Sequence, residues 1–315
     1  MRNIFNAVNK PSPDASRSAG AGLALPSGAL RQLDHLQLNA GRFLAGSREG
    51  LRPSLRRRPS ADFLEHRSYA PGDDVRFVDW KASARSEHIY IKQGEQPKEA
   101  TVAVFIDCSA SMGWGSPPKS GATLLLAMAL SYLALAHGDR LVLAPYGQTA
   151  ARSLGPLSGK GQVPGVLTYL RALPFGGQAS LGGAALKFLH EQNLTSGLVL
   201  VLSDFLAEDG LEQILDHFPA PLWQVALLQI LHPDELAPHA LGSVEVQDAE
   251  THQSANYDIT PRAARDYQQN LSAWQAALDM TCVRHYAQFT TIPTNWTLET
   301  DVLSHLQRIN LVKPL

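Results

Sequence analysis

The sequence has little cysteine and no long hydrophobic run. Only two cysteines, Cys108 and Cys282, occur in 315 residues, which excludes a disulfide framework and favours a reducing compartment. The longest apolar stretch, residues 123–136, is shorter than the about 20 residues that cross a bilayer, and it is typical of a buried core helix. The amino-terminal segment lacks the apolar core of a signal peptide. We therefore expect a cytoplasmic protein with no transmembrane segment.

Charge is also sparse and unevenly distributed. Charged residues make up 18% of the chain and the net charge is −2, so the whole chain is not an obvious nucleic-acid binder. Residues 1–100 carry 16 Lys and Arg against 11 Asp and Glu, whereas residues 101–315 carry 11 against 18. The basic stretch at 52–58 lacks the interleaved aromatics that stack on bases. It is interpreted as a solvated loop or a docking patch for an acidic partner.

From residue 100 onward, short apolar runs alternate with helical patterns. Near-continuous Val and Leu strands separated by helices are typical of a parallel sheet covered on both faces. The fold class predicted is therefore α/β, a doubly wound and mostly parallel sheet. The expected strands are 101–107, 140–146, 197–204 and 222–231, and the expected helices are 119–137, 161–172, 181–192 and 209–217.

The two ends of the chain have different patterns. Residues 1–22 are rich in Pro, Ser, Ala and Gly and are expected to be a flexible lead-in. Residues 23–99 are expected to form an extension, and residues 100–312 the α/β domain. The extension should hold a helix at 28–46 and a hairpin or two short strands within 63–80. The tail should hold a hairpin within 242–259, a helix at 261–281, a strand at 283–290 and a helix at 298–308.

Polar side chains follow two of the expected strands. Asp107 ends the first strand and is followed by Ser109 and Ser111, and Asp204 ends the third. Ligands of doubly wound sheets bind beyond the carboxyl ends of the strands, and carboxylate and hydroxyl oxygens are the donors that Mg²⁺ prefers. These residues predict a magnesium site, and the alternative is a structural turn in which they cap the following helix.

The same residues carry a resemblance. "DCSASM" with the later "LSD" resembles the metal-ion-dependent adhesion site of von Willebrand factor A domains. The stretch "EHRSYAPGDDVRFVDWKASAR" leading into "VFIDCSASM" resembles the bacterial domain-of-unknown-function family fifty-eight. The residues that match that family's pattern are Arg67, Tyr69, Pro71, Gly72, Asp73, Arg76, Asp79, Trp80, Ala84 and Arg85.

The resemblance implies a von Willebrand factor A-like fold with an amino-terminal extension. It also implies a partner, usually an AAA+ ATPase of the MoxR type. Many members of the family carry amino-terminal membrane segments, which this sequence does not show. The third metal loop departs from the pattern, because residues 176–181 lack the expected Thr. Ser180 could supply the missing hydroxyl, or the ligand could be lost.

Two further groups of residues are assigned roles. The mixture of both charge signs in the extension is more typical of a salt-bridge network than of catalytic acids, and it comprises Arg67, Tyr69, Asp73, Arg76, Asp79, Trp80 and Arg85. Trp80 is expected to be buried where the extension packs on the α/β domain. Trp114 is expected at the rim of the strand-end crevice as a partner contact, or else folded back over the helix at 119–137.

The predicted function is a non-enzymatic protein-interaction module. In this hypothesis Mg²⁺ binds a partner's carboxylate, and the partner is the MoxR-type ATPase. The alternative is a metal-dependent hydrolase that uses Asp107 and Asp204. The sequence contains no G-x-S-x-G element and no phosphate-binding P-loop. The chain is therefore not itself the ATPase.

Overall fold

The computed structural model describes most of the chain from residue 100 onward and parts of what precedes it. The described residues are 20, 22–39, 58–59, 65–70, 75, 78–86, 88–94, 100–147, 151–192, 194–206, 211–237, 242–247, 249 and 253–315. The chain divides into two compact units, one formed by Met1–Ala45 with Ala100–Leu315 and the other by Gly46–Glu99.

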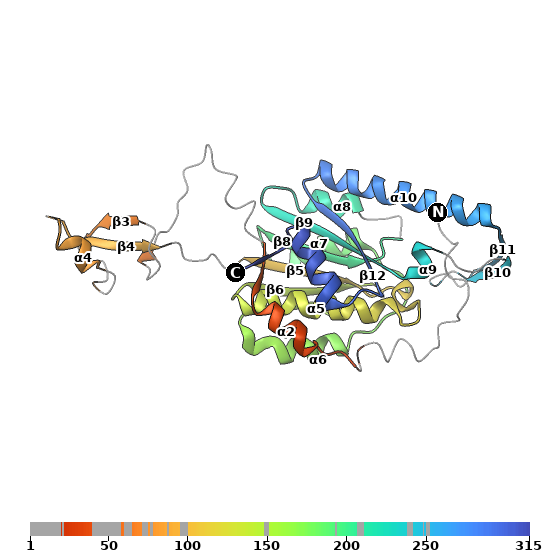
Figure 1. Ribbon diagram of the computed structural model, residues 1–315, viewed down its shortest axis with the longest axis horizontal. Coiled ribbons are helices and arrows are strands. Elements are labelled where there is room, and N and C mark those ends of the chain that lie inside the picture. Colours follow the sequence, from red (N-terminus) through yellow and green to blue (C-terminus); the bar gives the residue numbers. More distant parts are fainter. Residues whose placement is uncertain are drawn as a thin grey trace. The chain divides into compact units, whose positions relative to one another are not determined.

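A six-stranded sheet forms the centre of the larger unit (Figure 1). Its order is β12-β9-β8-β5-β6-β7, and all neighbours are parallel except β6 and β7, which are antiparallel. The strands are β5 (Thr101–Asp107), β6 (Arg140–Tyr146), β7 (Leu154–Leu157), β8 (Gly197–Ser203), β9 (Trp223–Leu231) and β12 (Gln288–Pro293). The predicted parallel α/β class is confirmed, whereas the antiparallel edge strand β7 was not predicted.

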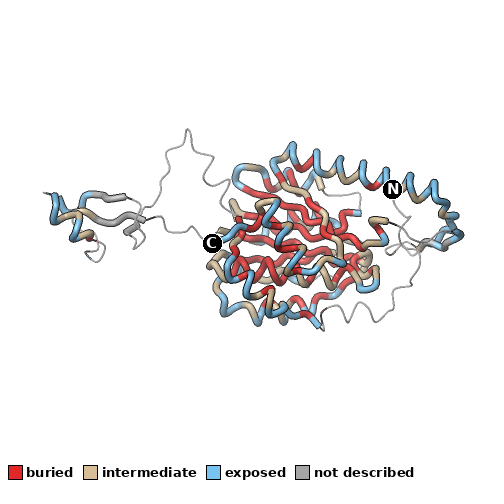
Figure 2. Tube along the Cα trace, viewed as in Figure 1, coloured by how far each residue is buried: buried red, intermediate tan, exposed pale blue. Residues whose placement is uncertain are grey.

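Helices cover both faces of this sheet (Figure 1). Successive side chains of a strand point to opposite faces, so Val104 and Ile106 of β5 join one apolar core while Ala103 and Phe105 join the other. The first core is closed by α5 (Lys119–Ala136) and α6 (Val163–Arg171), and the second by α7 (Leu181–Gln192), α8 (Leu211–His217) and α10 (Pro261–Arg284). Figure 2 shows the buried strands between exposed helix surfaces.

Helix α5 is more apolar than α6, α7 and α10. Among the described residues it is the one helix long and apolar enough to cross a membrane, but 72% of it is buried inside the protein. Ser131 donates to the carbonyl of Ala127, so this polar side chain is satisfied within the helix. The helix fills the core between the sheet and α6, which agrees with the core helix predicted for this stretch.

The start and the end of the chain meet in the larger unit. Strand β1 (Leu36–Leu38) pairs antiparallel with β13 (Val312–Pro314), and α2 (Ser27–Leu33) buries Leu33 in the first core. The predicted helix at 28–46 was therefore too long, and residues 23–39 belong to the α/β domain rather than to an extension. The π-helical turn η4 (Leu298–Val302) and α11 (Leu303–Arg308) complete this region.

Three smaller elements complete the larger unit. The predicted tail hairpin is present as β10 (Gly242–Gln247) and β11 (Ser254–Ile259), which form a separate two-stranded sheet. Short helix α9 (Pro233–Leu236) follows β9, and the 3-10 helix η3 (Lys160–Gln162) precedes α6.

The smaller unit contains a three-stranded antiparallel sheet of order β2-β4-β3. Strand β3 (Glu65–Ser68) and strand β2 (Arg58–Pro59) both pair with β4 (Tyr90–Gly94). One of the two strands expected within 63–80 is therefore present as β3, but its partner is β4, and most of residues 71–77 lies outside the described residues. Residues 80–83 instead form helix α4 (Trp80–Ser83), which Asp79 caps by accepting from the amides of Lys81 and Ala82.

The predicted salt-bridge network is described only in part. Asp73 and Arg76 lie outside the described residues, as does the side chain of Arg67, and Arg85 is exposed. Tyr69 is half-buried, and its amide donates to the carbonyl of Ile89. Trp80 is 66% exposed, so its own unit does not bury it. That Trp80 packs on the α/β domain stays a prediction.

Candidate functional site

The carboxyl ends of β5 and β8 hold a compact group of buried polar side chains. Asp107 accepts from the amide of Ser109 at 2.8 Å, from the hydroxyl of Ser203 at 2.5 Å and from the hydroxyl of Tyr146 at 3.3 Å. The hydroxyls of Ser109 and Ser111 lie 3.0 Å apart at the start of the 3-10 turn η2 (Ala110–Gly113). Parallel strands end at the same edge, and this brings the sequence-predicted Asp107, Ser109, Ser111 and Asp204 into one site.

Asp107 is held in an environment that disfavours its charge. Burial and the nearby Asp204 carboxylate raise the pKa of Asp107 to about 6, although the hydrogen bonds from Ser203 and Ser109 act in the opposite direction. Burial and the Asp107 carboxylate also raise the pKa of Tyr146 well above its usual value. The tyrosine hydroxyl therefore stays protonated and donates to Asp107.

Lys119, the first residue of α5, provides the positive charge of the site. Its Nζ lies 2.8 Å from Oδ2 of Asp204 and 2.6 Å from Oε1 of Glu235, and its side chain is 1% exposed. The second oxygen of each carboxylate is also occupied, because Leu206 donates its amide to Asp204 and His232 donates its amide to Glu235. These bonds satisfy both carboxylates from within the chain.

The ion pair between Lys119 and Asp204 favours the charged form of each residue. Burial alone would lower the pKa of Lys119, but the carboxylates of Asp204 and Glu235 raise it above its ordinary value. Burial acts to raise the pKa of Asp204, yet the Lys119 ammonium holds it below the usual value. The pKa of Glu235 is raised by burial. Lys119 and Asp204 are therefore both charged at neutral pH.

The backbone around Asp204 is fixed from the neighbouring strand. Gln229 of β9 donates its side-chain amide to the carbonyl of Asp204 at 3.0 Å, and its oxygen accepts from Gln275 and Thr291. This polar chain, in which Gln229 is fully buried and Gln275 and Thr291 are half-buried, joins the site to α10 and β12. It orients Asp204 without contacting the carboxylate itself.

Ser180 lies apart from the group of hydroxyls. It is exposed, and its Oγ accepts from the amide of Gly183 in the first turn of α7 at 3.4 Å. The loop before it does reach the site, because Gly177 accepts from the amide of Ala110 and Gly176 donates to the carbonyl of Cys108. The third loop is thus positioned by its backbone, and the predicted Ser180 hydroxyl serves its own helix.

Trp114 is buried rather than placed at the rim. It is 9% exposed, its ring packs edge-on against His232 at 5.2 Å, and Nζ of Lys119 lies 5.9 Å from the ring centre. The expectation of an exposed Trp114 is therefore wrong. The alternative, a Trp folded back over the helix that begins at Lys119, describes its position.

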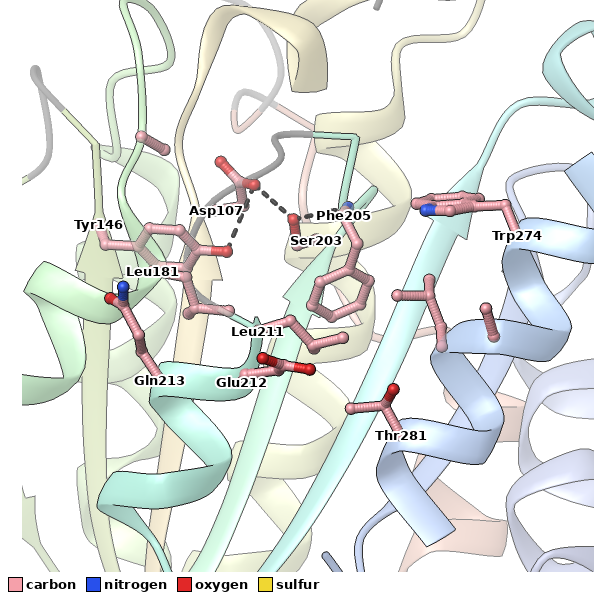
Figure 3. Close-up of a pocket in the computed structure, with 13 residues that line it drawn as sticks. Asp107, Tyr146, Leu181, Ser203, Phe205, Leu211, Glu212, Gln213, Trp274 and Thr281 are labelled. Atoms are coloured by element: carbon pink, nitrogen blue, oxygen red, sulfur yellow. Dashed lines mark hydrogen bonds between the residues drawn. The ribbon is translucent and has the colours of Figure 1, made fainter. Parts of the chain in front are cut away.

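A cavity of about 480 Å³ opens beside Asp107 (Figure 3). Asp107, Tyr146 and Ser203 lie at one end of it, where dashed lines mark their hydrogen bonds. The rest of the wall comes from Phe205, from the start of α7 and the loop before it, from the start of α8 and from α10. It comprises Ala179, Leu181, Leu211, Glu212, Gln213, Trp274, Ala277, Leu278 and Thr281. Within the described part of the chain, the cavity combines apolar walls with two carboxyl groups and is lined by no Lys, Arg or His.

Sequence reasoning missed four members of the site, namely Lys119, Glu235, Ser203 and Tyr146. Lys119 left a signal, since it is the single charge at the start of a long apolar helix. Ser203 and Tyr146 also end strands, as Asp107 does, so the edge argument applied to them. Glu235 lies within "HPDEL", and nothing in that segment pointed to Lys119.

The oxygen atoms of the site suit an ammonium group better than a hydrated Mg²⁺ ion. Mg²⁺ requires about six oxygens at 2.0–2.1 Å, whereas Asp204 already binds Lys119, and hydroxyls and an amide of the chain occupy Asp107. Within the described part of the chain, no three His, Cys, Asp or Glu side chains are grouped to hold an ion. The magnesium site stays a prediction.

The cysteines are not placed as nucleophiles. Both thiols are buried, and burial raises the pKa of Cys108 well above its usual value and that of Cys282 to about 12. Thiols become reactive as thiolates, which requires a lowered pKa. Neither cysteine supplies a nucleophilic site.

The fold and site together define an α/β protein with a polar group and a cavity at the carboxyl edge of its parallel sheet. A sequence model of the family described as "Protein of unknown function DUF58" matches residues 65–277, and the chain belongs to that family. The relatives include uncharacterized proteins of Mycobacterium bovis (Mb1516) and Mycobacterium tuberculosis (Rv1480). Each is 26% identical over 245 residues, which cover 76% of this chain and 75% of the relative.

Solved structures with a similar chain path include two examples at low identity. The BatB protein of Bacteroides thetaiotaomicron has a TM-score of 0.37 and 11% identity, and the match covers 67% of this chain and 98% of that one. The von Willebrand factor A domain of SpRpn10 has a TM-score of 0.39 and 10% identity, covering 65% and 94%.

Proposed function

We propose that this chain is a non-enzymatic protein-interaction module whose partner docks at the carboxyl ends of β5 and β8. The observation that carries this proposal is the cavity beside Asp107. Ligands of parallel α/β sheets bind beyond this edge, and binding sites are usually concave and mostly apolar with a few polar groups. The cavity has this composition and this position.

The surface next to the cavity favours a protein partner. Leu206 directly follows Phe205, which lines the cavity, and is 40% exposed, so a large apolar side chain faces solvent next in sequence to the cavity wall. A partner that enters the cavity would contact this side chain, which makes Leu206 a suitable position at which to probe docking. The charged groups below it are paired with one another, which suits a rigid scaffold more than proton transfer.

The chemistry of the cavity favours a basic side chain from the partner. Asp107 and Glu212 both line it, and none of the described residues that line it is a Lys, Arg or His. A Lys or Arg side chain would place its apolar stem against Leu278 and Trp274 and its charge toward the Glu212 carboxylate, because the oxygens of Asp107 already accept hydrogen bonds within the chain. The partner class we propose, a MoxR-type AAA+ ATPase, rests on the family resemblance.

Calorimetry with the purified ATPase of this type from the same organism tests the proposal. Leu206→Asp should weaken binding at least about tenfold, which is 1.4 kcal/mol. Leu222→Asp is the matched control, because Leu222 is 57% exposed and precedes β9 at the opposite edge of the sheet. Equal affinity of wild type and Leu206→Asp, or equal loss in both variants, would remove the strand-end edge as the docking surface.

The alternative of a metal-dependent hydrolase has a direct assay. Purified protein is incubated with Mg²⁺ or Mn²⁺ and generic phosphoesters, and turnover is compared between wild type and Asp107→Ala. Turnover that the substitution abolishes would favour an enzyme. We expect none above the buffer control.

A further inference from the structure

Lys119 is buried in a way that is uncommon for a lysine. Its side chain is 1% exposed, and lysines are almost never fully buried unless they are paired. Here the ammonium lies between Asp204 at 2.8 Å, in the loop after β8, and Glu235 at 2.6 Å, in helix α9 that follows β9. The side chain therefore links three separate elements at the carboxyl edge of the sheet.

The ammonium has two carboxylate acceptors and an aromatic ring nearby. An ammonium has three donors; two reach the carboxylates, and the ring of Trp114 lies 5.9 Å away on another side. The free oxygens of Asp204 and Glu235 accept backbone amides. Such a chain of bonds compensates the cost of burying charge.

This ammonium contacts one of the two carboxylates that the sequence predicted as metal ligands. A divalent ion bound to Asp204 would have to displace Lys119 or lie beside it, and like charges at such distances repel strongly in a buried site. Asp107 offers no substitute, since its oxygens already accept from Ser109, Ser203 and Tyr146. The positive charge that a metal would supply is thus part of the chain.

We propose that the Lys119 ammonium is the resident cation of this site and that the site keeps its structure without a divalent metal. The proposal concerns the isolated chain and does not depend on the partner. Its failure is therefore distinguishable from a failure of the docking proposal.

Two experiments on the full chain test this proposal. The first is calorimetric titration with Mn²⁺ and with Mg²⁺, and the second is a set of melting curves with and without each ion. Wild type should give no saturable heat and no shift in melting temperature. Lys119→Met should melt at a much lower temperature, because it leaves two buried carboxylates without a cation. The triple variant Lys119→Met with Asp204→Asn and Glu235→Gln should recover a large part of that loss.

The triple variant separates charge from packing. If Lys119 served only as a space-filling stem, methionine alone would preserve the melting temperature, and that result would overturn the proposal. Saturable Mn²⁺ binding by wild type that Asp107→Ala or Asp204→Ala abolishes would overturn it as well. If Lys119→Met does not fold, the triple variant and the wild-type titration still decide between these outcomes.

Discussion

At the scale of single residues, the effect of the buried charges is measured most readily through the pKa of Asp107. Its folded pKa of about 6 lies above the ordinary 3.8 because burial and Asp204 disfavour the charge. A carboxyl with a raised folded pKa contributes stability that is fully present below about pH 4 and is lost as the pH rises through 6. The difference between the folded pKa of about 6 and the ordinary 3.8 lowers the free energy of unfolding by roughly 3 kcal/mol at neutral pH.

Asp107→Asn should therefore stabilise the metal-free protein at pH 7. The neutral amide can still accept from Ser109 and contact Ser203, and the free energy of unfolding should rise by up to roughly 3 kcal/mol. Urea unfolding at pH 7 and pH 4 measures this, and the advantage should shrink at the lower pH. The opposite result would be that Asp107→Asn is less stable than wild type, with a larger loss at pH 7 than at pH 4. That result would show that a cation binds the ionised carboxylate.

Trp114 provides a second test at this scale. Its ring fills the space between His232 and the Lys119 ammonium, so Trp114→Ala should cost about 3–5 kcal/mol, as for large buried side chains. Partner affinity per folded molecule should stay unchanged. Denaturation run beside calorimetry separates the two effects, and full stability with weakened binding would return Trp114 to the docking surface.

At the scale of elements, the strands and helices around the site were predictable because their patterns were unambiguous. The expected bounds of β5, β6 and α7 agree with the structure, and those of β8, β9 and α5 differ by one residue. Each strand is a continuous apolar run that ends abruptly at polar residues. Predicting where the strands end therefore also predicted the edge of the sheet that carries the site. The side chains at that edge were predicted where they follow a strand directly.

The parts of the structure that were not predicted depend on contacts between residues far apart in the sequence. The pairing of β1 with β13 joins residues near the two ends of the chain, and β3 pairs with β4 across helix α4. Lys119 and Glu235 are 116 positions apart, and their contact arises from the order of β5, β8 and β9. Periodicity carries no information on such pairings, and this is why the resident cation was missed.

The placement of α2 gives a testable consequence. Leu33 is fully buried in the first core although it lies in the segment expected to form an extension. Leu33→Ala should destabilise the protein by about 2–5 kcal/mol. Arg31→Ala, an exposed neighbour on the same helix, is the control. Equal stability of both variants in thermal denaturation would mean that the amino-terminal segment does not belong to the core.

At the scale of the whole molecule, the chain consists of two units of very different size. The smaller one exposes several large apolar side chains, Val75, Trp80 and Ile89. Trp80→Ala should leave the main melting transition unchanged, because the side chain is 66% exposed. A loss of several degrees in differential scanning calorimetry would instead support the prediction that Trp80 packs on the α/β domain.

The central claim, that a partner docks at the carboxyl edge of the sheet, is tested most directly by amide hydrogen exchange with and without the MoxR-type ATPase. We predict slower exchange on binding in peptides that cover 108–114 and 204–206, next to Asp107 and Leu206. Peptides that cover 194–197 and 219–222, at the opposite edge, should exchange at the same rate in both samples. Protection confined to that opposite edge, or no protection in 108–114 and 204–206 when the ATPase is bound, would contradict the account.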